Sequence, residues 1–161
     1  DRDPLEGAAA AGRWDDGTFD VLYTAIDRDG AVGEIYYHLL KGQPVFPSKM
    51  KFKIFELKVS LQRVLPLPDF IDLNQLNIET ENYGKLDYAL RRTEYAPTQE
   101  LGEAAHFLDF DGLLVPNARW NCLNLVVFAD KIKPDKITEI EDRGVIDWDS
   151  WRQENQDQFN H

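Results

Sequence analysis

Three short polar stretches are the places in this sequence where side chains could do chemistry. They are Gly12-Arg13-Trp14, then Glu34 close to the apolar face of a helix-like segment, and then Val115 to Arg119 with Asn124 shortly after. A guanidinium in a glycine-containing turn is suited to bind phosphate oxygens through two parallel hydrogen bonds. A carboxylate can stabilise a developing positive charge, and an asparagine amide both donates and accepts hydrogen bonds. These stretches are the candidates for a functional site.

The motifs of the common enzyme classes are missing. The chain has no glycine-rich phosphate loop followed by Lys-Ser/Thr and no GxGxxG fingerprint. His38, His106 and His161 are scattered and are interpreted as surface or core residues, so no metal site is predicted. Cys122 is interpreted as a buried small apolar residue. Neither Ser48 nor Ser60 has the sequence context of a hydrolase nucleophile.

Composition narrows the class of protein further. The 161 residues weigh 18.6 kDa, which is the size of one domain, and the formal net charge is -11 with a pI near 4.6. Such an acidic surface repels phosphate backbones, so direct nucleic-acid binding is not expected. One cysteine excludes an internal disulfide. No membrane-length apolar run or signal peptide is visible, and a cytoplasmic location is predicted.

The elements that would position the polar stretches can be read from apolar spacing. A strand is expected over residues 21–25, followed by a helix with Asp29 as its cap and apolar residues up to Leu39. A long strand is expected from Phe52 to Leu61, with a bulge or bend near Phe55 where the alternation changes parity. The remaining expected elements are a short helix at 72–76, a weak helix at 82–92, a better helix opened by Pro97, and strands at 112–115, 123–128 and 137–140. This irregular order predicts a single α+β domain with largely antiparallel sheets and flanking helices.

Taken in order, the motifs resemble those of the RES domain family, which is named for an Arg, a Glu and a Ser. The resemblance runs from about Gly12 to Phe128. The matching segments are Ala11-Gly12-Arg13-Trp14, Val21-Leu22-Tyr23-Thr24-Ala25, Ala31-Val32-Gly33-Glu34, Thr98-Gln99 with Leu101-Gly102, Asp109 to Ala118, and Asn124-Leu125-Val126-Val127-Phe128. Each motif alone is weak, and their order and spacing carry the resemblance.

The resemblance implies a fold related to the ADP-ribosyltransferase toxins, with NAD+ as substrate and no prosthetic group. Many family members are toxins of toxin–antitoxin pairs that cleave NAD+ by hydrolysis or phosphorolysis, and their usual partner is an antitoxin with a helix-turn-helix domain. Two alternatives stay open, namely transfer of ADP-ribose to a protein and a catalytically degenerate domain that binds nucleotides or an antitoxin. A homo-oligomer is also compatible with the sequence.

Roles for three residues follow from this resemblance. Glu34 would stabilise the oxocarbenium-like centre at the ribose, and Arg13 would bind the pyrophosphate. Tyr23 would stack on the nicotinamide or bind a ribose hydroxyl. The alternatives are a solvated helix residue for Glu34, a surface ion pair for Arg13 and a core aromatic for Tyr23.

The later stretch departs from the family pattern. Asn117 stands where the family has its Ser, and its amide could hold the nicotinamide carboxamide or a ribose hydroxyl. Arg119 is a candidate second phosphate contact, with a solvated loop residue as the alternative. Asn124 could bind the substrate or brace the loop through backbone groups.

The two ends of the chain carry further expectations. Residues 1–145 are assigned to the RES-like domain and 146–161 to a polar C-terminal tail. Family members usually carry another Arg before the Gly-Arg-Trp turn, and Arg2 lies too close to Arg13 to match it, so a truncated start is expected. Trp148, Trp151 and Phe159 are the apolar residues of the tail, which would either dock on the domain or on an antitoxin, or fray.

Overall fold

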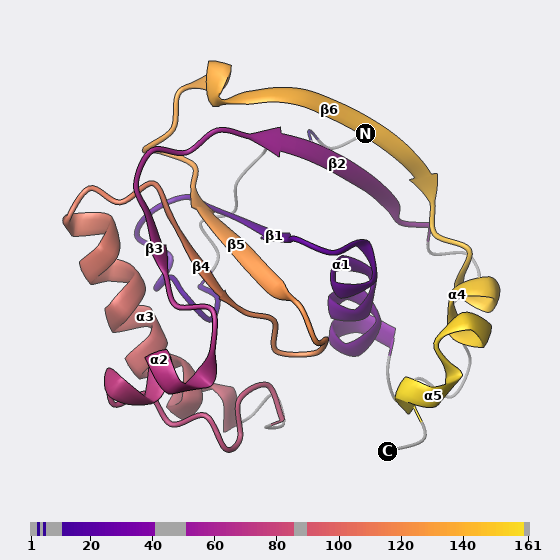
Figure 1. Ribbon diagram of the computed structural model, residues 1–161, viewed down its shortest axis with the longest axis horizontal. Helices are drawn as coiled ribbons and strands as arrows, with labels where there is room; N and C mark the ends of the chain where they lie inside the picture. Colours follow the sequence, from indigo (N-terminus) through magenta and orange to yellow (C-terminus); the bar gives the residue numbers. More distant parts are fainter. Residues whose placement is uncertain (1–2, 4, 6–10, 41–50, 86–89, 160–161) are drawn as a thin grey trace.

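The central sheet is built from the most apolar runs of the sequence. The computed structural model describes residues 3, 5, 11–40, 51–85 and 90–159, so Arg2 lies outside the described residues. The four strands are ordered β1-β5-β4-β3, where β1 is Val21–Ala25, β3 is Val64–Pro66, β4 is Gly112–Pro116 and β5 is Leu123–Phe128 (Figure 1). The pairs β1–β5 and β4–β5 are antiparallel, whereas β3 runs parallel to β4.

A second, two-stranded sheet arches over the first. It pairs β2 (Lys53–Val59) antiparallel with β6 (Ile137–Val145), and in Figure 1 it spans the top of the molecule above β1 and α1. The register shifts between Lys53 and Phe55, which confirms the bulge expected from the change of parity. The sheets are thus largely antiparallel with helices at their flanks, and the predicted single α+β domain is confirmed.

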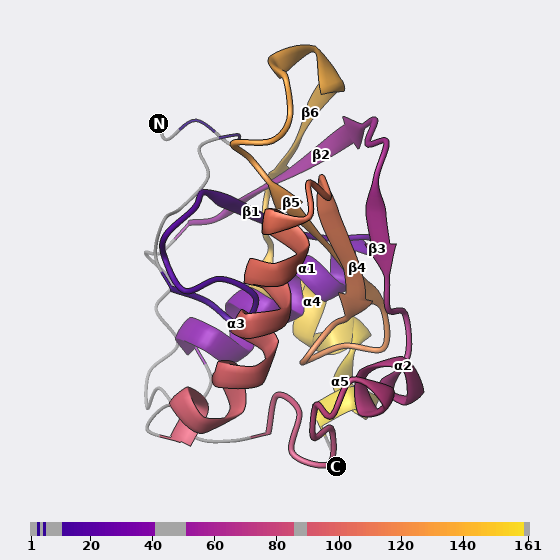
Figure 2. The same ribbon diagram turned by 90° about the vertical axis from the view of Figure 1, so that its left-hand side faces the viewer.

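The helices lie at both ends of the central sheet. They are α1 (Arg28–Ile35) continued by a π-helical turn (Tyr36–Leu40), α2 (Phe70–Gln75), α3 (Arg91–Phe107), a 3₁₀ turn (Pro134–Lys136), α4 (Trp148–Glu154) and α5 (Gln156–Phe159). Figure 2 shows α3 running alongside the central sheet, with α1 and α4 behind it in that view. None of these helices of the described residues is long and apolar enough to cross a membrane.

The expected starts of two helices were wrong, and one short strand was not expected. Helix α3 begins at Arg91 and contains Pro97, because loss of one backbone hydrogen bond is outweighed by the contacts of this helix with the rest of the domain. Helix α1 is capped by Asp27, whose carboxylate accepts hydrogen bonds from the backbone of the first turn, and not by Asp29. Strand β3 was missed, since its three residues precede a proline-rich stretch.

The main core fills the space between α3 and the central sheet. Its buried residues come from β1, β4 and β5, from α3, from the segment before β1 and from the region between β3 and α3; they are Trp14, Phe19, Val21, Leu67, Leu73, Ile78, Tyr83, Ala105, Leu113, Val115, Val126 and Phe128. In β4 and β5 every second residue faces this core, namely Leu113 and Val115 in β4 and Val126 and Phe128 in β5. Burial of this apolar surface is the main stabilising term for the sheet.

The C-terminal segment forms a second core with α1. Trp148 and Trp151 pack with Val32 and Ile146 in a cluster that also contacts β2. The Trp151 indole N–H donates to the Asp29 carboxylate at 3.0 Å. Of the three arrangements left open for this segment, the structure shows the one in which its tryptophans dock on the domain. The side chain of Phe159 lies outside the described residues.

Candidate functional site

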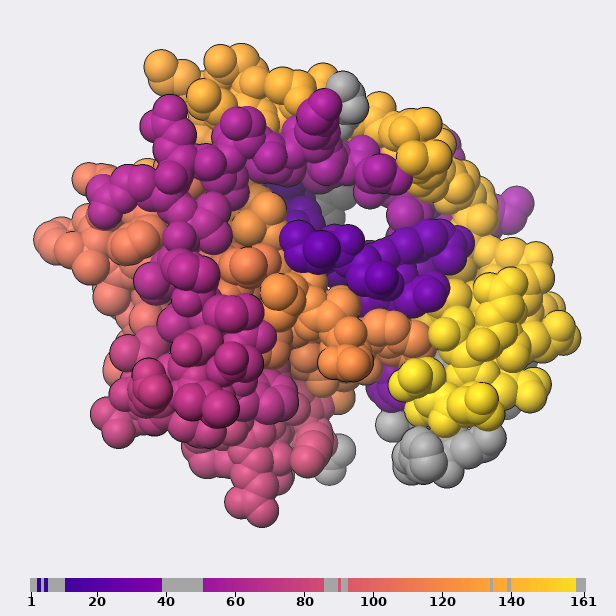
Figure 3. Space-filling model, viewed as in Figure 1, coloured from indigo at the N-terminus to yellow at the C-terminus, as the bar shows by residue number. Residues whose placement is uncertain are grey.

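A cavity of about 1200 Å³ lies between β1, α1 and the arching β2–β6 sheet. Figure 3 shows the surface hollowed at this place, between β2 and α1. The cavity is lined by five of the six residues proposed from the sequence, which are Arg13, Tyr23, Glu34, Arg119 and Asn124. Asn117 is not among the lining residues. The fold therefore brings together residues that are up to about a hundred positions apart in the chain.

Arg13 is held between two aromatic rings at the cavity wall. Its guanidinium carbon lies 4.3 Å from the ring centre of Tyr83 and 4.8 Å from that of Tyr95. The guanidinium also forms an ion pair with Glu94, whose other neighbour is the backbone N–H of Gly84 at 2.7 Å. The side chains of the pair are 10% and 5% exposed, so this is a buried pair and not the surface pair considered from the sequence.

Helix α3 fixes the backbone of the turn that carries Arg13. The Thr98 hydroxyl donates to the Arg13 carbonyl at 2.5 Å, and the Gln99 amide donates to the Gly12 carbonyl at 2.7 Å. Together with Glu94, these residues occupy one face of the helix. The turn is therefore positioned by three side chains of α3, and Arg13 has little freedom to leave the cavity wall.

Tyr23 contributes its ring to the cavity and its hydroxyl to the fold. The hydroxyl donates to the Asp15 carboxylate and accepts from the Trp14 backbone N–H at 3.0 Å. Asp15 is fully buried and also accepts from the backbone N–H of Gly12 at 3.1 Å and of Gly17 at 3.2 Å. Burial and the neighbouring Asp15 carboxylate raise the pKa of the Tyr23 hydroxyl, which stays protonated as a donor. The part of Tyr23 left for a ligand is its ring face.

Replacing Tyr23 by Phe is expected to lower the free energy of unfolding by about 1–3 kcal/mol, because the Trp14 N–H loses its side-chain acceptor and the buried Asp15 Oδ1 keeps only one of its two donors, the Gly12 N–H. Thermal or urea unfolding measures this loss. Tyr95→Phe is the matched control, since no residue in the described part of the chain bonds the Tyr95 hydroxyl, and its unfolding free energy is expected to change by less than about 0.5 kcal/mol. Equal losses in the two variants would contradict the role of the Tyr23 hydroxyl.

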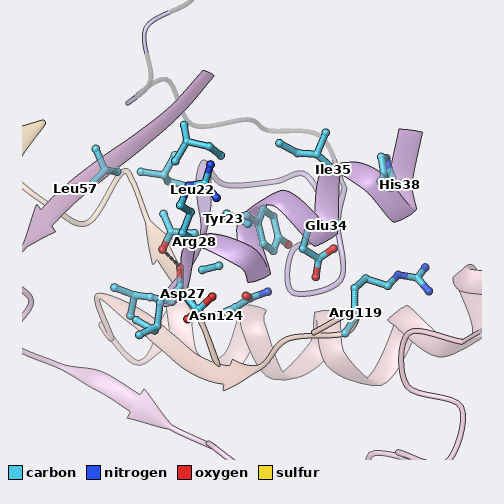
Figure 4. Close-up of a pocket in the computed structure, with 18 of the residues that line it drawn as sticks. Leu22, Tyr23, Asp27, Arg28, Glu34, Ile35, His38, Leu57, Arg119 and Asn124 are labelled. Carbon is cyan, nitrogen blue, oxygen red and sulfur yellow. Dashed lines mark hydrogen bonds between the residues drawn. The ribbon is translucent and has the colours of Figure 1, made fainter. Parts of the chain in front are cut away.

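Glu34 lies on the cavity side of α1. Glycines of the same helix let it approach the loop before β5: a methyl group on Gly30 would overlap the Cys122 sulfur, and one on Gly33 would lie 3.0 Å from the Trp120 ring. In the view of Figure 4, Glu34 lies between Tyr23 and Arg119. The carboxylate is half-buried and has no hydrogen-bond or ion-pair partner among the described residues. It is thus placed to interact with a ligand.

The loop after β4 supplies Arg119. Its guanidinium donates to the Gly84 carbonyl and lies 5.7 Å from the Tyr37 ring centre. Gly84 has φ of +74°, and any larger residue there would overlap the Ala118 carbonyl. Arg119 is therefore tied to the same 83–84 turn that contacts the Arg13–Glu94 pair.

The charges that line the cavity are unusual for so acidic a chain. Four arginines line it and no lysine of the described residues does; they are Arg13, Arg28, Arg119 and Arg143. The carboxylates of the lining are Asp27, Glu34 and Glu56. Because arginine binds phosphate in a two-pronged geometry that lysine lacks, this lining favours an anionic ligand with phosphate groups. No group of three or more potential metal ligands occurs in the described ranges.

Asn117 and Cys122 belong to the scaffold of the loop. The oxygen and the nitrogen of the Asn117 side-chain amide both form hydrogen bonds within the protein. Asn124, which accepts from that nitrogen, is the residue that lines the cavity. Desolvation raises the pKa of the Cys122 thiol, which disfavours the thiolate and agrees with a packing role.

Comparison with known proteins identifies the family of this domain. The sequence matches the RES domain over residues 1–149. The chain belongs to the RES domain family. The structure is similar to a chain in the crystal structure of the M. tuberculosis MbcT-MbcA toxin-antitoxin complex, with a TM-score of 0.70 and 23% sequence identity over 94% of this chain and 82% of that chain. The comparison with curated proteins gave no match.

Several of the RES motifs of this chain line the same cavity. The Gly12–Trp14 turn, the β1 strand, α1 and the loop before β5 each contribute lining residues, although they are spread over most of the domain. Sequence reasoning missed Glu94, Tyr83 and Tyr95, which hold Arg13. One feature of the sequence pointed toward them: the Thr98-Gln99 segment resembles the family, and it lies on the helix that positions the turn carrying Arg13.

Proposed function

We propose that this RES domain acts as a toxin that cleaves NAD+ at the bond between nicotinamide and ribose. The observation that carries the proposal is the placement of the unpaired Glu34 carboxylate in the same cavity as Arg13 and Arg119. A carboxylate stabilises positive charge at the ribose C1 as nicotinamide leaves with the bonding electrons. Arginines in that cavity suit the two negative charges of the pyrophosphate.

The reaction balances with water or inorganic phosphate as the acceptor. Water attacks C1 and yields ADP-ribose, nicotinamide and a proton, whereas phosphate yields the phosphorylated ADP-ribose. The Tyr23 ring and the Asn124 amide would contact the nicotinamide riboside part of the substrate. Asn117 lacks the hydroxyl of the family's serine, but Asn124, at the start of β5 and bonded to Asn117, gives the cavity a polar group, which argues against a degenerate site.

A partner is part of the proposal. The fold resembles a chain of a structure described as a toxin–antitoxin complex. By analogy we propose that an antitoxin with a helix-turn-helix domain binds this chain and suppresses its activity. Copurification of the two proteins from a coexpressing host tests this part.

Incubation of the purified protein with NAD+ tests the activity. Nicotinamide release in equal amount to ADP-ribose is expected in phosphate-free buffer for a hydrolase, and phosphate dependence for a phosphorylase. Radiolabel from NAD+ that remains attached to a lysate protein would instead indicate ADP-ribosyl transfer. If calorimetry detects no NAD+ binding and no nicotinamide forms, the proposed function is wrong.

A further inference from the structure

The Asn117 side chain is buried and both ends of its amide are engaged. It is 5% exposed and sits beneath α1, where Gly30 leaves the space for it. The side-chain oxygen accepts from the backbone N–H of Arg119 at 2.7 Å and of Trp120 at 2.8 Å. This is the geometry in which an asparagine stabilises a turn through its own loop.

These two backbone donors fix which way the Asn117 amide points. Backbone N–H groups only donate, so the atom that faces them must be the oxygen, and the nitrogen must face the other way. That nitrogen lies 2.8 Å from the Asn124 side chain, and because it only donates, the facing atom of Asn124 must be its Oδ1. The orientation of the Asn124 amide thus follows from that of Asn117, which the backbone N–H groups of Arg119 and Trp120 fix.

The remaining atom of the pair is the Asn124 Nδ2. Asn124 pairs with Ala25 at the end of β1 and lines the cavity close to the strand that carries Tyr23. Among the residues that the structure describes, no group accepts a hydrogen bond from this nitrogen. The cavity therefore meets an NH₂ donor here, and an acceptor is what it can bind.

We propose that Asn117 is a positioning residue that locks the Asn124 amide, so that Asn124 donates to a carbonyl oxygen of the ligand. In a dinucleotide cleaved at its nicotinamide, that oxygen belongs to the carboxamide, and this assignment rests on the proposed function. Asn117 acts through Asn124 without touching the ligand. The family's serine position thus serves recognition indirectly in this chain.

The lock can be tested without a ligand by replacing Asn117 with Asp. Aspartate still accepts from the two backbone N–H groups and keeps the turn, but it presents an oxygen to Asn124. Asn124 must then rotate its amide and donate its NH₂ to Asp, which turns an acceptor toward the cavity. Side-chain amide resonances in ¹H–¹⁵N spectra are expected to show the Asn124 NH₂ exchanging rapidly with water in the wild type and markedly more slowly in N117D. An unchanged Asn124 exchange rate would overturn the lock.

The ligand part is tested with two dinucleotides of equal charge and nearly equal shape. NAD+ carries a carboxamide that both donates and accepts, whereas 3-acetylpyridine adenine dinucleotide carries an acetyl group that only accepts. The wild type, which presents a donor, is expected to bind both with similar affinity. In N117D the carboxamide can rotate to donate, but the acetyl group cannot, so the affinity ratio is expected to shift by about tenfold against the acetyl analogue. The added charge affects both dinucleotides equally and cancels in the ratio.

Asn117→Ser is the neutral control. Serine supports the turn through its hydroxyl but is too short to reach Asn124, so the amide can turn either way and the ratio is expected to stay within about threefold of the wild type. An unchanged ratio in N117D would overturn the assignment of the carbonyl contact. If the wild type binds neither dinucleotide, the proposed function and the carbonyl contact fail together, whereas the exchange measurement still decides whether Asn117 locks Asn124.

Discussion

Replacing Glu34 by Gln is expected to lower the rate of nicotinamide release by about 10²–10³-fold while the protein remains folded. The side chain has no partner among the described residues, so its loss breaks no internal interaction, and Gln keeps nearly the same shape. What disappears is the negative charge that faces the developing cation at C1. The loss should therefore fall on kcat, with little change in the KM for NAD+.

The matched control is Glu56→Gln. Glu56 also lines the cavity, but it is bound to Arg143 on the paired strand, with 2.8 Å between its oxygen and the guanidinium nitrogen. This variant removes the same charge from the cavity at a point assigned to no catalytic role, and its rate is expected to stay within about threefold of the wild type. Equal rates for Glu34→Gln and the wild type would remove Glu34 from the mechanism. A similar fall in both variants would mean that the overall charge of the cavity, and not the position of Glu34, sets the rate.

Strands β1 and β5 could be predicted from the sequence because their apolar runs are buried within one sheet. Residues 21–25 and 123–128 have few polar interruptions, and they pair with each other in the structure. Strand β3 could not be found in this way, since its pairing with β4 is parallel and non-local and its sequence ends in Pro66. The start of α3 was also missed, because Pro97 looks like a first-turn residue unless the contacts of Glu94 are known.

The candidate site shows the same division. Arg13, Tyr23 and Glu34 could be proposed from the sequence because each stands in a short segment with a chemical reason for its type, and all three line the cavity. The groups that hold Arg13 could not be predicted from the sequence, because Glu94 is 81 residues away and its sequence context is that of an exposed helix residue. Asn117 and Asn124 were both found, but which of the two reaches the cavity depends on hydrogen bonds to the backbone of the loop. Only the three-dimensional arrangement shows that.

The close approach of α3 to the Arg13 turn predicts the second large effect, at Gly102. This glycine lies inside α3, where a methyl group would overlap the Trp14 carbonyl oxygen. On helix propensity alone, Gly102→Ala should stabilise the protein by about 1 kcal/mol. We expect the opposite sign, a loss of about 3 kcal/mol in the free energy of unfolding, because the helix or the turn must move to relieve the overlap with the backbone.

The same displacement should reach the site. The turn is bonded to Thr98 and Gln99 on α3, so a shift of about 1 Å would move Arg13 relative to Glu34 and lower the rate of nicotinamide release by about 10²-fold. Urea unfolding and nicotinamide release, measured on the same preparation, check both effects. Ala104→Gly, at an exposed position of the same helix, is the control: it should cost about 1 kcal/mol by propensity and leave the rate unchanged. A Gly102→Ala protein more stable than the wild type would show that α3 does not hold the turn as closely as its hydrogen bonds to Gly12 and Arg13 require.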